Sequence, residues 1–259
     1  MLGDALFPDW FPQWFLDYTA SHDAIVIAAN YRLLPGVKGL EILSDVRDLF
    51  SWMRTSLNTH LDGISPGVQA DIDQVLVAGE SAGGYLAIQS ALLEGAFVKA
   101  VVAGYPMLDY ESEFFSTNIP KVIFDAPMMS IEDADAIISA AKSAPVMSEN
   151  LDPAAMVIAK AVLQQGRIGE LLGDDESLFP MKTVGKVKAL PFTFIMHGKQ
   201  DTVVPVEGTE NFAKTAGERL RESLHVEYRD GEHGFDADSG LDDEWLQRGL
   251  AKVTKAWLG

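Results

Sequence analysis

The chain has 259 residues, of which 47% are hydrophobic and 22% are charged. This composition is typical of a globular protein, and the length suits one large α/β domain or two small domains. Lys and Arg number 20 against 38 Asp and Glu, so the formal net charge is −18 at pH 7. A surface this negative repels phosphate groups, which argues against nucleic acids and anionic membranes as partners.

Several protein classes are excluded by what the sequence lacks. It contains no cysteine, so disulfides, zinc–thiolate sites and cysteine nucleophiles are ruled out. No apolar run approaches the roughly 18 residues of a membrane span. The first basic residue is Arg32, so the start has no positive region of the kind a signal peptide needs. We therefore expect a cytoplasmic protein.

An aromatic segment opens the chain. Trp10, Trp14 and Tyr18 recur at every fourth position, which predicts a helix with one apolar face. That face is expected to pack on the core, and an aromatic substrate site is the alternative.

Five short apolar runs rich in β-branched residues follow, and unbroken runs of this length predict strands buried on both faces. They are Ala24–Ala29, Gln74–Ala78, Val98–Ala103, Phe192–Met196 and Leu224–Tyr228. Helical patterns occupy Leu43–Leu57, Gly84–Leu93, Glu207–Ser223 and Leu241–Leu258. Strands alternating with helices predict an α/β fold with a mostly parallel sheet flanked by helices.

The region from Asp109 to about Leu190 breaks this alternation. It is rich in Met, Ala and short helical patterns and contains five prolines. We interpret it as a helical lid inserted above the sheet. The chain then divides into the first part of the core (1–108), the lid (109–190) and the second part of the core (191–259).

The motif with the clearest chemistry is Gly79-Glu80-Ser81-Ala82-Gly83, which fits G-x-S-x-G. It lies between a predicted strand and a predicted helix, the context that this nucleophile turn requires. Such a turn exposes the hydroxyl of Ser81 and aims the backbone N–H of Ala82 at a developing oxyanion. Gly79 and Gly83 lack Cβ atoms, so the strand and helix are expected to approach closely there.

A serine hydroxyl needs a base to take its proton, and His233 is the best candidate. It lies in a glycine-flanked loop just after the last predicted strand. His197 ends the preceding strand and is interpreted as a residue that stabilises a turn. The other histidines are interpreted as structural or surface residues: His22, His60 and His225.

The carboxylate that orients the base is assigned to Asp201, in the loop after the strand Phe192–Met196. The order Ser81, Asp201, His233 is the Ser–Asp–His order of α/β-hydrolases. Asp230 is the alternative acid, although its position three residues before His233 also suits a carboxylate that caps the loop.

No metal or cofactor is expected. The acidic clusters at 174–176 and 242–244 lack the loop geometry of a calcium site. No lysine follows Gly84, so the glycines around Ser81 do not form a phosphate-binding loop.

Four segments resemble one esterase family. They are Asn30–Pro35, which resembles a Y-R-L-x-P segment, the following Asp45, the elbow Gly79–Gly84, and the acid loop His197–Pro205. The chain resembles the hormone-sensitive-lipase-like esterases, fold-3 of the α/β-hydrolase superfamily, and Ala155–Asp174 resembles the lid of fungal members. The resemblance implies a carboxylesterase, with a catalytic triad of Ser81, Asp201 and His233 and a small-molecule ester of small to medium chain length as substrate.

One feature of that family is missing. Its H-G-G-G segment supplies the remaining oxyanion donors, and the sequence contains no such segment. In the family strand order 1-2-4-3-5-6-7-8, Ala24–Ala29 would be strand 4 and Gln74–Ala78 strand 5, with strand 3 absent between them. We expect either a gap in the sheet or direct pairing of these two strands. One explanation is a natural sequence that extends upstream of Met1; the other is a short variant completed by dimerisation.

Two other functions stay open. Plant hormone receptors of the resembled family bind ligands without hydrolysing them, and the missing H-G-G-G segment favours this class. A lyase or cyclase that reuses the same pocket is a further alternative.

Overall fold

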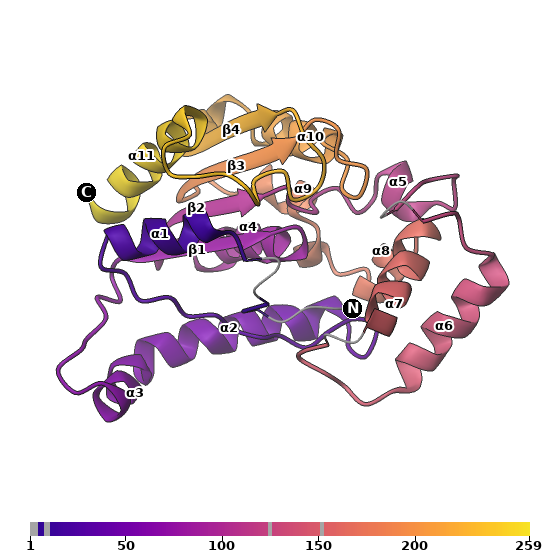
Figure 1. Cartoon of the computed structure of the whole chain (residues 1–259), viewed down its shortest axis with the longest axis horizontal. Helices are drawn as coiled ribbons and strands as arrows, with labels where there is room; N and C mark the ends of the chain where they lie inside the picture. The colour runs from indigo at the N-terminus through magenta and orange to yellow at the C-terminus, as the bar shows by residue number, and fades with distance from the viewer. Residues whose placement is uncertain (1–4, 8–10, 124–125, 151–152) are drawn as a thin grey trace.

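The computed structural model describes residues 5–7, 11–123, 126–150 and 153–259. Its centre is a sheet of four strands in the order β1-β2-β3-β4, and every neighbouring pair is parallel (Figure 1). The strands are β1 (Val75–Glu80), β2 (Val98–Gly104), β3 (Phe192–Gly198) and β4 (Leu224–Arg229). Four of the five predicted strands are therefore confirmed, each within two residues of its expected ends.

Helices cover both faces of the sheet, because alternate strand residues point to opposite sides. Ala100 and Val102 pack against one group of helices, and Val101 and Ala103 pack against the other. The first group is α1 (Gln13–Ser21) and α11 (Glu244–Leu258). The second includes α2 (Gly39–Thr55), α4 (Ala82–Glu94), α9 (Pro180–Val184) and α10 (Glu207–Ala216), with α3 (Leu57–Ile64) and η3 (Glu218–Ser223) nearby.

The predicted aromatic helix is confirmed as α1. Trp14 and Tyr18 are buried against α11 and the sheet, so the apolar face packs on the core. Trp10 lies outside the described residues.

The segment 109–190 is mostly helical, as the sequence predicts. Figure 1 shows its first helices beyond the tips of the strand arrows, at the carboxyl edge of the sheet. The helices are α5 (Glu113–Ser116), α6 (Ile131–Ser143), α7 (Pro153–Gln164), α8 (Ile168–Leu172) and η2 (Glu176–Leu178), followed by α9. No helix in the described ranges is long and apolar enough to cross a membrane.

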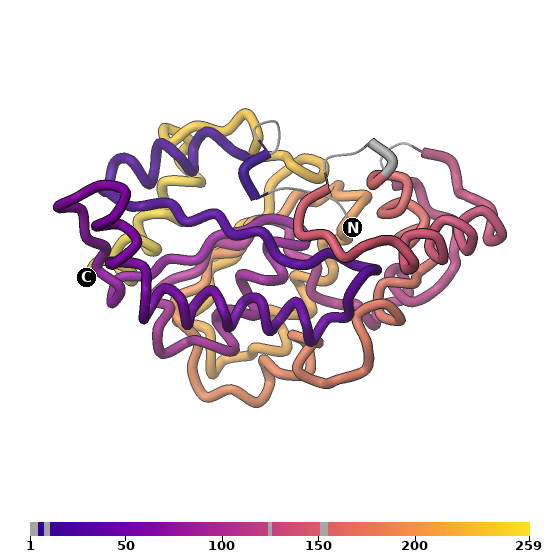
Figure 2. Tube along the Cα trace, turned by 90° about the horizontal axis from the view of Figure 1, so that it is seen from below, coloured from indigo at the N-terminus to yellow at the C-terminus, as the bar shows by residue number. Residues whose placement is uncertain are grey.

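The predicted strand Ala24–Ala29 is wrong. These residues run as a coil alongside β1 without joining the sheet (Figures 1 and 2). Their β-branched composition favours extended backbone, but a strand also needs a partner for its N–H and C=O groups. Both this coil and β1 line a cavity of about 1710 Å³. The segment 24–29 therefore does not pair directly with β1, and a gap separates the two, which is one of the two expected outcomes.

The end of this coil is anchored by the segment Asn30–Pro35, which resembles the Y-R-L-x-P sequence, and by Asp45. The backbone N–H of Arg32 donates to Asp45 Oδ2 over 2.9 Å, and its guanidinium donates to Asp45 Oδ1 over 2.7 Å. These bonds tie the Y-R-L-x-P segment to α2, so this pair holds the chain on the far side of the cavity.

The gap predicts uneven hydrogen exchange within the sheet. Among the described residues, β1 is paired on one side only, whereas β3 is paired with both β2 and β4. Backbone amides of β1 should therefore exchange faster than those of β3, because fewer bonds must break for a local opening. Deuterium uptake of peptides covering 75–80 and 192–198 measures this, and equal protection would contradict one-sided pairing.

Candidate active site

The carboxyl ends of the four strands meet at one edge of the sheet, and each carries a residue of the candidate site. Ser81 follows β1 directly, and Tyr105 follows β2 directly. Asp201 lies in the loop after β3, and His233 lies in the loop after β4. Parallel pairing places these loops side by side, although the residues are far apart in the sequence.

The backbone of Ser81 has the sharp turn that its motif predicts. Its φ is +53° and its ψ is −116°, so it lies outside the regions that side-chain-bearing residues normally adopt. Its N–H donates to the carbonyl of Gly104 over 2.9 Å, and its carbonyl accepts from the N–H of Met107 over 3.2 Å. Contacts with the end of β2 therefore support a strained serine at the start of α4, as is common at functional sites.

Close packing at this turn depends on Gly79 and Gly84. A Cβ on Gly79 would lie 2.4 Å from the carbonyl oxygen of Gly83, and one on Gly84 would lie 2.9 Å from that of Gly104. A Cβ on Gly83 would meet nothing within 4 Å. The expected close approach therefore occurs at Gly79. At Gly83 a Cβ would fit, so the prediction of close packing there is wrong. Gly84 is instead the second position of this turn where a Cβ would collide with backbone.

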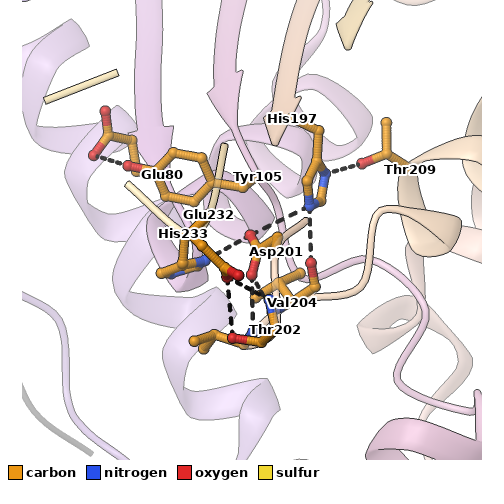
Figure 3. A network of polar contacts seen from close by, with 10 residues as sticks. Glu80, Tyr105, His197, Asp201, Thr202, Val204, Thr209, Glu232 and His233 are labelled. Atoms are coloured by element: carbon orange, nitrogen blue, oxygen red, sulfur yellow. Dashed lines mark hydrogen bonds and ion pairs between the residues drawn. The ribbon is translucent and has the colours of Figure 1, made fainter. Parts of the chain in front are cut away.

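The structure brings the predicted base and acid together. His233 Nδ1 lies 2.8 Å from Asp201 Oδ2 (Figure 3). The Asp201 side chain is fully buried, whereas that of His233 is 18% exposed. The other carboxylate oxygen, Asp201 Oδ1, accepts from the N–H groups of Val203 and Val204 over 2.9 and 2.8 Å. Asp201 is thus fixed by its own loop and presents one oxygen to the imidazole.

Hydrogen bonds keep Asp201 ionised despite its burial. Burial raises the pKa of this carboxyl, but bonds with His197 and His233 and the backbone of Val204 more than offset it and lower the pKa to about 2. A carboxylate that stays ionised favours the tautomer of His233 with its proton on Nδ1. Nε2 is then free to act as a base.

His197 is a structural residue of the same loop, in agreement with the sequence interpretation. It is fully buried, with Nδ1 2.8 Å from Thr209 Oγ1 and Nε2 2.9 Å from the carbonyl oxygen of Val204. Both ring nitrogens are engaged within the protein, so His197 braces the loop that carries Asp201 (Figure 3).

The alternative acid, Asp230, is not beside the base. Its side chain is 84% exposed, and Lys199 Nζ lies 3.2 Å from its Oδ1. A different acid links the two loops: Glu232 accepts from the N–H and the hydroxyl of Thr202 over 3.0 and 3.1 Å. Nothing in the sequence pattern points to this contact, because it joins two separate loops.

Ser81 and His233 both line the cavity of about 1710 Å³, together with Ala82 at the start of α4. Apolar side chains from the region 109–190 reach the same cavity, namely Met156 and Leu163 of α7. Within the described ranges, no three His, Asp or Glu side chains come together as metal ligands.

Four residues at the site were missed by the sequence analysis as functional residues. The ring of Tyr105 lies 4.5 Å from that of His233, between centroids. The Tyr105 hydroxyl donates to Glu80 Oε2 over 2.7 Å, and Trp14 Nε1 donates to Asp236 Oδ2 over 2.9 Å. Glu80 had a visible signal in its place inside the elbow motif, and Trp14 had one in the aromatic spacing of the first helix.

Comparisons with known proteins agree with this geometry. A family model described as the alpha/beta hydrolase fold matches residues 8–237. The chain is 30% identical over 268 residues to a probable carboxylesterase M8 of Phoma sp., covering 99% of this chain and 82% of that protein. It is 30% identical over 204 residues to a probable carboxylesterase clz11 of Cochliobolus lunatus, covering 74% and 92%.

A solved structure is also similar to almost the whole chain. It is an alpha/beta hydrolase superfamily protein from Enterococcus faecalis, with a TM-score of 0.62 and 19% identity over 98% of this chain and 85% of that one. The likeness covers the fold, and the family match covers most of the sequence. The chain therefore belongs to the alpha/beta hydrolase fold family, in its hormone-sensitive-lipase-like branch, and is a carboxylesterase-like member of it.

Proposed function

We propose that the chain hydrolyses carboxylic esters of small to medium chain length through an acyl-enzyme on Ser81. The observation that carries this proposal is the Asp201–His233 hydrogen bond of 2.8 Å, which ends at the cavity that Ser81 also lines. A nucleophile on a strained turn, a base and an ionised acid are the parts that this chemistry needs.

In the proposed reaction, His233 takes a proton from Ser81 and later passes it to the leaving alcohol. Ser81 Oγ attacks the ester carbonyl carbon while His233 Nε2 takes its proton, and Asp201 stabilises the imidazolium that forms. When the tetrahedral intermediate collapses, the C–O bond breaks and His233 returns the proton to the leaving alcohol. Water then attacks the acyl-enzyme with His233 again as base. The acid is released and Ser81 is regenerated.

The oxyanion of the tetrahedral intermediate needs hydrogen-bond donors in the site. The N–H of Ala82 is the donor that we assign to it, because this group begins α4 directly after Ser81. Removing one such donor typically reduces kcat by about 10²–10³-fold.

The substrate pocket is assigned to the same cavity. Met156 and Leu163 give it apolar surface beside Ser81, which suits an acyl chain or an alcohol group. Since these residues belong to α7, the region 109–190 is proposed to act as the lid that sets substrate size.

The nucleophile is tested by Ser81→Ala. We expect kcat for p-nitrophenyl butyrate to fall by roughly 10⁶-fold, because without the hydroxyl no acyl-enzyme forms. Initial rates measured with the wild-type chain and the variant give this ratio, and circular dichroism shows whether both are folded. The matched control is Ser51→Ala, an exposed serine on α2, which should leave the rate unchanged. A folded Ser81→Ala chain with wild-type activity would refute the proposal.

The two candidate acids are separated by Asp201→Asn and Asp230→Asn. The first removes the acceptor for the Nδ1 proton of His233, so the wrong tautomer forms and kcat should fall by about 10⁴-fold. The second alters an exposed side chain and should leave kcat unchanged. Rates with p-nitrophenyl acetate at pH 7 measure both, and an equal loss in the two variants would contradict the assignment of Asp201.

A further inference from the structure

Two carboxyl groups meet in the wall of the cavity that Ser81 and His233 also line. Glu80 is the last residue of β1 and directly precedes Ser81. Asp236, which is 1% exposed, follows His233 by three residues. The two carboxyl groups are close enough to act on each other. Each also accepts one bond from a neutral donor, Tyr105 in the case of Glu80 and Trp14 in the case of Asp236.

Contact between the two carboxyl groups favours a proton shared between them. An ionised carboxylate only accepts hydrogen bonds, so two of them in contact would repel each other with no donor between them. Burial, followed by the charge of Asp236, raises the pKa of Glu80 to about 8, although the bond from Tyr105 acts in the opposite direction. At neutral pH Glu80 therefore holds its proton and faces Asp236 as a hydrogen-bond donor. Trp14 donates to the same Asp236 carboxyl.

We propose that Glu80 and Asp236 share one proton, and that this pair positions Tyr105 and the imidazole of His233 beside Ser81. The part that concerns His233 rests on the proposed hydrolytic function. Both carboxyls act through other residues, so they are positioning residues.

Tyr105 connects the pair to the base. Its backbone has a φ of +32°, which is unusual for a residue with a side chain, and its N–H donates to the carbonyl of Met196 over 2.7 Å. Its ring meets the ring of His233 at an angle of 60°, and its hydroxyl bonds to Glu80 (Figure 3). The residue before the nucleophile thus anchors a side chain that packs on the base.

Asp236 fixes the loop of the base from the other side. It lies in the loop that carries His233, and its carboxyl accepts from Trp14 of α1 and faces Glu80 of β1. The pair therefore ties this loop directly to the strand that ends at Ser81. Loss of the shared proton would place two charges at this junction and separate the loop from the strand.

The pH dependence follows from the raised pKa of Glu80. The unfolded chain releases this proton near pH 4.5 and the folded chain near pH 8, so the free energy of unfolding falls as pH rises through that interval. Two titratable groups face Glu80, Asp236 from the loop after β4 and Tyr105 after β2. Trp14 from α1 is neutral, and His233 contacts Tyr105 on its ring.

The test is Glu80→Gln, because glutamine has the shape of the protonated acid and still accepts from Tyr105 and donates to Asp236. With p-nitrophenyl butyrate, we expect wild-type kcat/KM to fall about tenfold per pH unit above pH 8. Glu80→Gln should hold its own pH 7 activity to higher pH than the wild type does. Asp236→Asn, which also leaves one donor between the two groups, should behave in the same way.

The control is Asp230→Asn, which removes one exposed charge from the same loop, outside the cavity, and should follow the wild-type pH profile. Melting temperatures between pH 5 and 9 give a readout independent of catalysis. The wild type and Asp230→Asn should lose stability up to pH 8, and Glu80→Gln should lose less.

The two proposals fail in different ways. A wild-type chain without esterase activity would refute the proposed function, and the melting series would still decide the carboxyl pair. Parallel melting curves for the wild type, Glu80→Gln and Asp230→Asn would overturn the shared proton. If the melting curves diverge but the alkaline limbs of kcat/KM coincide, the pair is structural only and its role in positioning His233 is refuted.

Discussion

Parallel hydrogen bonding among four strands is the constraint on which the site depends. It brings the carboxyl ends of β1, β2, β3 and β4 to one edge, so that four loops from distant parts of the sequence lie together. Ser81, Tyr105, Asp201 and His233 come one from each of these loops or strand ends. Helices on both faces keep the sheet rigid, and the loops inherit that rigidity where their backbone is bonded to a neighbouring strand.

Two carboxyl groups at this edge have pKa values shifted in opposite directions, because their neighbours differ. Asp201 accepts from Val203, Val204 and His233, and its hydrogen bonds lower its pKa although it is buried. Glu80 faces another acid, and burial and the charge of Asp236 raise its pKa against the single bond from Tyr105. Burial raises the pKa at both sites, so the neighbouring groups decide the direction of the shift.

Much of the fold follows from local sequence, because periodicity and the elbow motif report on local backbone preference. The order of strands and helices, the turn at Ser81 and the Asp201–His233 pair could be predicted in this way. The strand expected at 24–29 could not, since composition favours extended backbone but does not supply the partner that a strand requires. The bond from Trp14 to Asp236 joins residues 222 positions apart, and no local pattern reveals such a contact.

That bond also has a consequence for how the chain is synthesised. Helix α1 packs on α11 and on the loop of His233, and Tyr18 bonds to Thr254 over 2.8 Å. Because these partners are synthesised 222 and 236 residues after Trp14 and Tyr18, the apolar face of α1 stays without its native cover while the intervening chain is made. Helix α1 therefore docks late relative to its own synthesis, and until then a nascent chain exposes Trp14 and Tyr18 to chaperones.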